Sequence, residues 1–397
     1  MRWKNQLRVF ALTLTIGIAA GVIAYLFSIS LNFVISVQQN TDWLFWLLPI
    51  GGTFVAYIYY RYGQQVMGGT TVLKEKIRTG DGSLPIRIIP LVWGGTLLTH
   101  LFGGSAGREG TALQLGGGVA AFFVFINRVT MDEKQRKTIL LSGMSAGFAA
   151  LFGTPLAAII FVLEAIAKRK QRLSASLHCV LAAFSGYFVS TWLGIQHTAY
   201  TITAIPRFHL LTMVKLLLFV LAITCAAYVF RLFVFVVKFV LQKYIVLPYF
   251  RSFVGGIIIV ILVYVTQSRD YLGLGLNIIE DAFAYAVSPV AAILKLLFTT
   301  ITVGSGFIGG EVTPLFSIGS ALGSSMAPLL HVAPSFLAAL GFAALFGAVS
   351  KAPIAASILG MEVFGLDVLL PLLFVCLLSS LCTQLLTKTF PIPTLST

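Results

Sequence analysis

The chain has 397 residues, of which 58% are hydrophobic and only 10% are charged, and its mean hydropathy is +0.96. Because soluble domains carry about 25% charged residues, this composition argues against a water-soluble enzyme. The net charge of +14 comes from short basic clusters between apolar runs, so it does not indicate nucleic-acid binding.

Apolar runs recur along the whole chain and predict membrane-spanning helices. Examples are residues 9–37, 44–60, 139–167, 210–230 and 368–386. Most approach or exceed the roughly 20 residues that a helix needs to cross hydrocarbon, which gives on the order of ten crossings. We expect an all-α integral membrane protein with one membrane domain over residues 1–397 and no soluble regulatory domain. The first run is too long for a signal-peptide core and is expected to be a crossing helix.

Basic residues cluster in the short segments between these runs, as the positive-inside rule expects of cytoplasmic loops. The clusters are Arg2, Lys4 and Arg8; Lys74, Lys76 and Arg78; Arg128, Lys134, Arg136 and Lys137; and Lys168, Arg169, Lys170 and Arg172. We therefore expect a multi-pass protein of the cell membrane, and a bacterial plasma membrane in particular. The four cysteines lie in apolar stretches without metal-ligand spacing, and the five histidines are scattered. Hence no disulfide, metal or cofactor is expected.

The chain also repeats itself. Residues 147–153, Gly-Phe-Ala-Ala-Leu-Phe-Gly, recur identically at 341–347, and a proline with a glutamate nine residues later follows each copy, Pro155 with Glu164 and Pro353 with Glu362. Two structurally related halves are predicted, residues 1–200 and 201–397. Such halves with glycine- and proline-interrupted apolar segments are typical of secondary transporters. The alternative is a duplication kept for helix packing, in which small residues let backbones approach.

A glycine-rich segment, residues 103–111, leads into an apolar stretch and carries Glu109. The start of a helix presents unpaired amide hydrogens at its positive end, so this turn can hold an anion. Glu109 could occupy the anion position when ionised and leave it when protonated, acting as both gate and proton carrier. The alternative is a structural Glu109 that pairs with Arg108 or caps the helix.

The second half contains a turn of the same design at residues 304–314, which carries Glu311. Pro314 suits the first turn of a helix, where a missing amide hydrogen costs little. Two such turns facing each other would form an anion site near the bilayer midplane. The alternative for Glu311 is helix capping, and for Glu164 and Glu362 we expect a structural role at helix ends.

These segments resemble the CLC family of anion channels and anion/proton antiporters. Residues 107–110, Gly-Arg-Glu-Gly, look like its GREG motif with the gating glutamate, and residues 309–314 occupy the place of its GGxFxP motif. The segments from Ala157 to Glu164 and from Lys351 to Glu362 look like two further family segments. The resemblance implies a CLC-like fold of two halves that are inverted repeats, with broken and re-entrant helices. It also implies a homodimer with one pore per subunit.

Several departures separate the chain from ordinary chloride exchangers. The family's first anion motif, GSGIP, corresponds to residues 66–71, where Met67 replaces the serine that coordinates chloride and Gly68 follows. Thr111 replaces a proline after the gate, and Ala165 lies near the place of an inner proton-transfer glutamate. The last helix has no tyrosine, and Phe390 is the nearest candidate for its position. These features resemble the fluoride-exporting branch of the family, which carries Glu-Val-Thr in the second motif.

The resemblance therefore implies a fluoride/proton antiporter that exports fluoride from the cytoplasm, and not an enzyme. Glu109 and Glu311 are the candidates for gating and proton transfer. The candidate anion-binding residues are Met67, Gly68, Gly107, Arg108, Gly110, Thr111, Gly310, Val312, Thr313 and Phe390. One alternative is a chloride/proton exchanger or passive anion channel of the same fold. Another is a membrane-embedded enzyme or structural subunit, which no pairing of nucleophile and base supports.

Overall fold

The computed structural model describes residues 2–66, 68–79, 84–127, 131–197, 199–207 and 209–393. Within these ranges the chain is all-helical, with sixteen α-helices, a few short 3-10 and π-helical turns, and no strand. The predicted fold class, an all-α protein built of apolar helices, is confirmed. Met67, one of the predicted anion-binding residues, lies outside the described residues.

The chain forms two compact units. Unit 1 comprises Met1–Val34, Ile58–Leu97 and Glu109–Thr198, and unit 2 comprises Ile35–Tyr57, Leu98–Arg108 and Ala199–Thr397. One boundary between the two units falls after residue 198. Two segments of the first half nevertheless pack in unit 2. The chain crosses from unit 2 into unit 1 between Arg108 and Glu109, in the middle of the first predicted motif.

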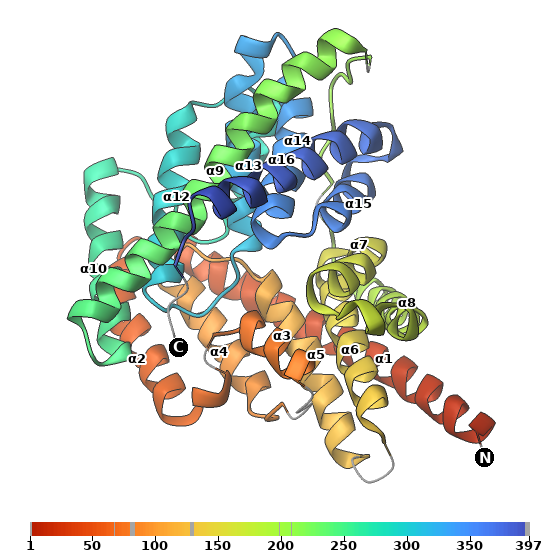
Figure 1. Ribbon diagram of the computed structural model, residues 1–397. Helices are drawn as coiled ribbons and strands as arrows, with labels where there is room; N and C mark the ends of the chain where they lie inside the picture. Colours follow the sequence, from red (N-terminus) through yellow and green to blue (C-terminus); the bar gives the residue numbers. More distant parts are fainter. Residues whose placement is uncertain are drawn as a thin grey trace. The chain divides into compact units, whose positions relative to one another are not determined.

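Unit 1 is built mainly from seven helices (Figure 1). They are α1 (Arg2–Asn40), α3 (Thr70–Thr79), α4 (Ile88–Leu101), α5 (Glu109–Ile126), α6 (Glu133–Phe152), α7 (Pro155–Phe161) and α8 (Arg169–Trp192), with a π-helical turn at Val162–Ile166. Helices α5 and α6 approach so closely that a Cβ atom on Gly116 would overlap the Gly143 carbonyl oxygen. Small residues thus set the packing distance, as in other membrane helix pairs.

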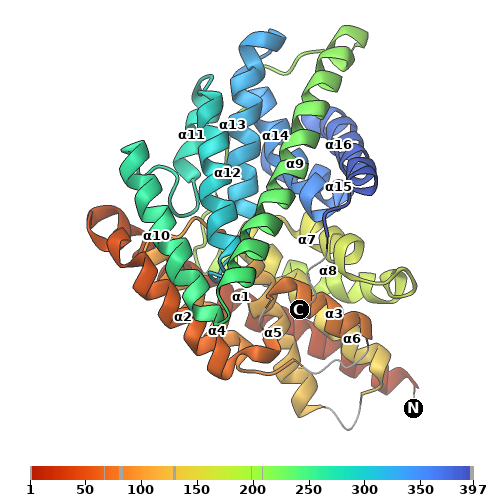
Figure 2. The same ribbon diagram turned by 60° about the vertical axis from the view of Figure 1, so that its left-hand side comes forward.

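Unit 2 contains most of α2 (Leu48–Tyr62) and eight further helices. These are α9 (Leu210–Tyr244), α10 (Pro248–Thr266), α11 (Leu276–Ala284), α12 (Pro289–Gly304), α13 (Val312–Leu330), α14 (Pro334–Ser350), α15 (Pro353–Phe364) and α16 (Leu369–Thr389). Helices α12, α13 and α14 run side by side (Figure 2). A Cβ atom on Gly319 would overlap the Gly341 carbonyl oxygen, so α13 and α14 repeat the close glycine contact of α5 and α6.

The two repeat copies differ by one helical turn. The heptapeptide copies are 194 residues apart, whereas Pro155 and Pro353 are 198 apart. In the first copy Gly153 ends α6 in the left-handed conformation, at φ +74°. In the second copy Gly347 remains helical and α14 continues to Ser350, where Lys351 takes the left-handed position. The four extra residues correspond to about 1.1 turns of α-helix.

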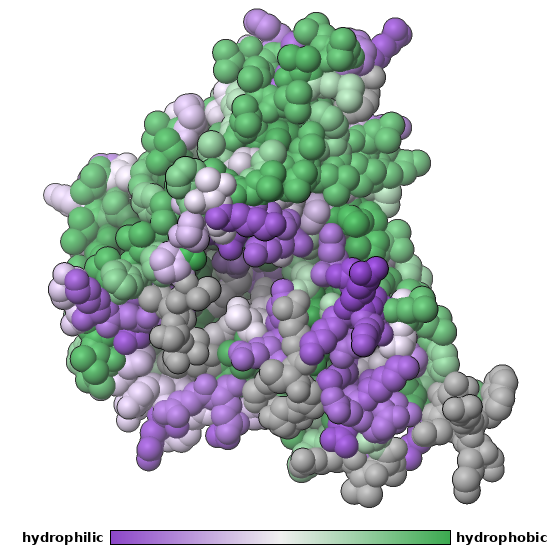
Figure 3. All heavy atoms as spheres, in the orientation of Figure 1, coloured by the Kyte–Doolittle hydropathy of each residue, from purple (hydrophilic) through white to green (hydrophobic). Residues whose placement is uncertain are grey.

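In the part of the chain that the structure describes, six helices are long and apolar enough to cross a membrane, among them α1, α9 and α16. Five further apolar helices in the same ranges have 10–17 residues, which is shorter than the roughly 20 residues a full crossing requires. The apolar run at 139–167, continuous in the sequence, is broken into α6 and α7 by Gly153 and Pro155. On α9, Leu210, Leu211 and Val214 are exposed, and the surface over this end of the helix is apolar in Figure 3, as lipid contact requires.

Candidate functional site

The glycine-rich segment before Glu109 forms a turn whose backbone is fixed by hydrogen bonds within unit 2. The Gly104 amide donates to the Thr99 carbonyl at 2.7 Å, and the Ala106 carbonyl lies 3.1 Å from His100 Nε2. Residues 103–107 are all buried. Because each of these contacts fixes a main-chain group, the turn presents a defined backbone path into the next helix.

Glu109 is the first residue of α5, and it is fully buried, with 0% of its surface exposed. A carboxylate at a helix N-terminus lies where the helix dipole favours negative charge. An ionised side chain buried in a membrane protein costs several kcal/mol unless it is compensated or takes up a proton. The structure thus places the Glu109 side chain in a buried position at the positive end of α5.

Three predicted anion-binding residues adjoin Glu109 and differ in what they can donate. The Thr111 hydroxyl is buried and lies 2.7 Å from the Thr96 hydroxyl, so its hydrogen-bonding capacity is shared with a neighbour. The Gly110 carbonyl accepts a hydrogen bond from Gln114 Nε2 at 3.0 Å. Arg108 is half-buried, and its Nε atom has no hydrogen-bond partner within the described part of the chain.

The second glycine-rich turn leads into α13. Val312 and Thr313 form its first residues and are 8% and 4% exposed, and Pro314 follows within the first turn. Glu311 occupies the N-cap position, but its carboxylate accepts no capping hydrogen bond from the described α13 backbone. The helix-capping alternative for Glu311 is therefore not supported, and its half-buried carboxylate is available for another role.

The two turns are joined by a pair of backbone hydrogen bonds. Gly107 N–H donates to the Gly310 carbonyl at 2.5 Å, and Gly310 N–H donates to the Gly107 carbonyl at 2.6 Å. The contact is close, since a Cβ atom on Gly309 would lie 2.6 Å from the Ala106 Cβ. Gly107 and Glu109 are only two peptide units apart, so their Cα atoms lie within about 7 Å. The sequence motifs at Gly107 and Gly310 therefore meet.

A charged residue that the sequence analysis did not single out interacts with Glu311. Arg231, near the middle of α9, interacts electrostatically with Glu311 and with Lys351, which ends α14. The Arg231 guanidinium also donates to the Thr387 hydroxyl on α16 at 3.3 Å. A single arginine in an apolar run gives little sequence signal, because its partners come from three distant helices.

Gly68 and Phe390 are the two remaining predicted residues that the structure describes. Gly68 is exposed and has a positive φ of +111°. Phe390 ends α16, with 59% of its surface exposed. Its carbonyl accepts a hydrogen bond from the Tyr228 hydroxyl on α9 at 3.3 Å. The end of α16 thus has a tyrosine hydroxyl beside it, but that tyrosine comes from α9.

Glu164 and Glu362 lie on the helices that follow the two heptapeptides. Glu164 is half-buried in the π-helical turn, and its backbone carbonyl accepts a hydrogen bond from Arg172 at 3.2 Å. Glu362 is half-buried near the end of α15. Their positions near helix ends agree with the sequence expectation.

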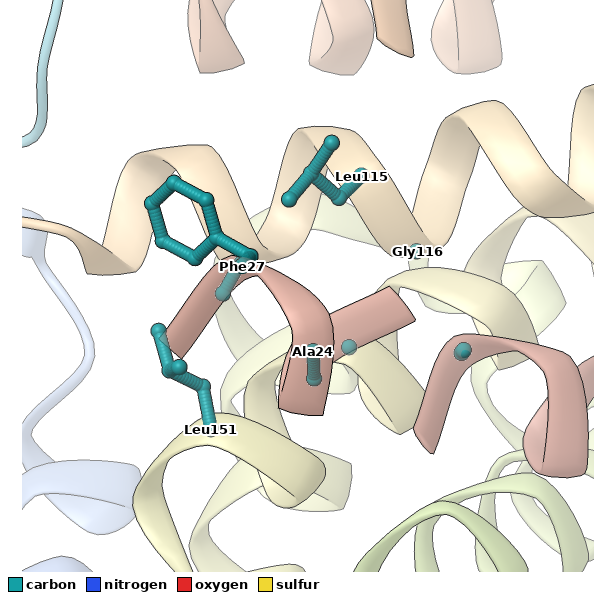
Figure 4. A pocket seen from close by; sticks show the side chains of 8 residues that line it. Ala24, Phe27, Leu115, Gly116 and Leu151 are labelled. Carbon is teal, nitrogen blue, oxygen red and sulfur yellow. The ribbon is translucent and has the colours of Figure 1, made fainter. Parts of the chain in front are cut away.

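A pocket in unit 1 is lined by apolar residues and is therefore poorly suited to bind an ion. Figure 4 shows Phe27, Leu115 and Leu151 around it, and the other lining residues are alanines and glycines. Hydrocarbon side chains offer no hydrogen-bond donor to an anion. Likewise, the described residues contain no group of three or more His, Cys, Asp or Glu side chains that could hold a metal.

Taken together, the apolar helices, the broken segments and the buried carboxylate after a glycine turn define a multi-pass membrane protein of the ion-transport class. The sequence profile of the family described as "Voltage gated chloride channel" matches residues 51–384. The chain therefore belongs to this family, which is the CLC family that the sequence motifs resemble.

Individual relatives agree with this assignment. A "Chloride/fluoride channel protein" of Pseudomonas syringae pv. tomato is 34% identical over 364 residues, covering 90% of this chain and 80% of that protein. The solved structure of a CLC-type fluoride/proton antiporter is also 34% identical, with a TM-score of 0.91 and 96% of both chains covered. A slow cyanobacterial Cl−/H+ antiporter, 22% identical, shares the fold with a TM-score of 0.82 over 96% of this chain and 95% of its own.

Proposed function

We propose that this protein is a fluoride/proton antiporter that exports fluoride from the cytoplasm, with Glu109 as gate and proton carrier. The observation that carries the proposal is the fully buried Glu109 at the start of α5, two residues after Gly107, which is bound to Gly310. The similarity to a fluoride/proton antiporter over 96% of the chain supports the choice of ion.

In this mechanism the ionised Glu109 carboxylate occupies the anion position at the N-terminus of α5, where the helix dipole favours negative charge. When Glu109 takes up a proton, that attraction is lost and a fluoride ion replaces it. Glu311 shares proton transfer, and Arg231 supplies the nearby positive charge. Movement of protons down their gradient would then drive fluoride out.

Fluoride is small and strongly hydrated, so selective export requires hydrogen-bond donors that replace its lost water. We assign this role to the main-chain amide of Gly110 and to the hydroxyls of Thr111 and Thr313, with Arg108 adding charge. Gly107 and Gly310 would border the anion position and hold the two turns together, because their amides donate to each other's carbonyls. Met67, Gly68, Val312 and Phe390 would line the path, where the Met67 thioether offers only a weak acceptor.

A second candidate is a chloride/proton exchanger or a passive anion channel on the same scaffold. One relative is named a chloride/fluoride channel protein and another a Cl−/H+ antiporter, so the family accommodates both ions.

Exposed apolar helices and family membership support a multi-pass location. We further propose a bacterial plasma membrane, a homodimer, and a single membrane domain of two related halves at residues 1–200 and 201–397.

The experiment that tests the proposed function is a halide selectivity series in liposomes, with internal pH recorded at the same time. An antiporter of fluoride gives fluoride efflux matched by proton uptake and a much smaller chloride flux. Equal fluxes of both ions with proton movement would assign a chloride exchanger, whereas anion flux that is indifferent to a proton gradient would assign a channel.

A further inference from the structure

A fully buried lysine lies inside unit 2, and the proposed mechanism does not use it. Lys295 is in α12 and has 0% of its surface exposed. Its ammonium group donates to the Ser105 hydroxyl at 3.0 Å, to the Tyr271 carbonyl at 3.0 Å and to the Gly273 carbonyl at 2.8 Å. Burying a charge is costly without such partners. The three acceptors use all three N–H donors of a lysine, so Lys295 has none left for an anion.

One of these partners, Ser105, belongs to the turn that precedes Glu109. Its hydroxyl lies 2.9 Å from the Thr299 hydroxyl, and its amide donates to the Thr302 hydroxyl at 3.2 Å. The Thr299 hydroxyl already donates to the Lys295 carbonyl, so Ser105 must donate to Thr299 while it accepts from Lys295. Every hydrogen-bonding group of Ser105 except its carbonyl is thereby fixed by α12.

The sequence spacing explains how one helix does this. Lys295, Thr299 and Thr302 are at positions i, i+4 and i+7 and therefore share one face of α12. The backbone also leaves room for the lysine, because Gly275 has φ +77° and a Cβ atom there would lie 2.6 Å from Lys295 Cε. The same atom would lie 2.8 Å from the hydroxyl of Ser317 on α13. The surroundings of the Lys295 side chain thus bring together the 103–108 turn, the segment before α11, and α13.

We propose that Lys295 is a positioning residue that holds the 103–108 turn in place through Ser105. Ser105 is two residues before Gly107, whose two hydrogen bonds to Gly310 join the turns. Loss of the ammonium group would leave Ser105 and two part-buried carbonyls without this donor and would let the turn move. The consequence for transport rests on the proposed function, because it assumes that the position of Glu109 sets proton coupling.

The test compares Lys295→Met and Ser105→Ala with Thr300→Val as the matched control. Thr300 is buried on the same helix, but its hydroxyl donates to the Leu297 carbonyl of its own helix and, among the described residues, not to the turn. Amide hydrogen exchange of a peptide covering residues 103–110 is measured in the full-length protein. We expect exchange about tenfold faster in Lys295→Met and in Ser105→Ala, since each removes a buried hydrogen-bond partner. Amide exchange in the double variant should be no faster than in Lys295→Met alone, because both substitutions break the same hydrogen bond.

Unchanged exchange in Lys295→Met, or an equal increase in Thr300→Val, would overturn the proposal. If Lys295→Met does not fold, amide exchange in Ser105→Ala is compared with that in Thr300→Val, and equal exchange overturns the proposal. In liposomes, Lys295→Met and Ser105→Ala should lower the proton-to-fluoride ratio about threefold or more, and Thr300→Val should not. A wild-type protein that moves fluoride without protons would refute the proposed function, whereas the exchange measurement would still decide the role of Lys295.

Discussion

Gly107 and Gly310 exchange both of their backbone hydrogen bonds, at 2.5 and 2.6 Å, although 203 residues separate them in the sequence. Each glycine lies in a turn that runs into a helix carrying a glutamate at its start, Glu109 in one case and Glu311 in the other. The pairing fixes the two turns to each other in unit 2. The account of the site depends on this contact more than on any single side chain.

The close approach of the turns predicts that Gly309→Ala destabilises the protein. The added Cβ would lie 2.6 Å from Ala106 Cβ, and overpacking of this kind costs about 1–3 kcal/mol. Gly194→Ala is the control, because Gly194 also has a positive φ but no atom within 4 Å of the added Cβ. Thermal unfolding in detergent should show a melting temperature at least about 2 °C lower for Gly309→Ala than for Gly194→Ala. Equal melting temperatures would mean that the turns can move apart freely.

The electrostatic interaction of Glu311 with Arg231 predicts non-additive effects on transport. Glu311→Gln and Arg231→Gln should each slow fluoride transport, because each leaves the other half-buried charge without its counterion. In the double variant the loss of transport rate, expressed as a free energy, should be smaller than the sum of the two single losses, with an interaction of about 0.5–3 kcal/mol. Arg269→Gln provides a control, since its ion pair with Asp42 involves a largely exposed carboxylate. Strictly additive rate effects would show that the two charges act independently.

The sequence motif around Met67 predicts that this residue influences the choice between fluoride and chloride. Replacing it by serine adds a hydroxyl donor where chloride exchangers of the family carry one, so Met67→Ser should raise chloride flux relative to fluoride flux. The ratio is measured with both anions in the same liposome preparation. An unchanged chloride-to-fluoride ratio would remove Met67 from the anion path.

Much of the fold could be predicted from composition and the repeat. Long apolar runs identify α1, α9 and α16. The break after Gly153 was missed, because hydropathy does not fall where a glycine in the left-handed conformation ends a helix. The packing of Ile35–Tyr57 with the second half was also missed, since periodicity contains no information about which helices pack together.

The site was predictable only where the motif is local. Glu109, Gly107 and Gly310 stand out because glycines and an acid interrupt apolar runs. Lys295 and Arg231 do not stand out, because each is a single basic residue among apolar neighbours. Their roles depend on hydrogen-bond partners on other segments, which the sequence does not reveal. Thr111 was predicted as an anion donor without its partner Thr96, which belongs to the preceding helix.

The central claim is that Glu109 exchanges places with a fluoride ion when it takes up a proton. The most direct measurement records fluoride efflux and proton uptake together in liposomes that contain Glu109→Gln. Glutamine has nearly the same shape but cannot carry the proton, so proton uptake should fall at least about tenfold while fluoride still moves. Glu133→Gln, at an exposed carboxylate paired with Lys137, should behave as wild type. Full proton coupling in Glu109→Gln would contradict the account.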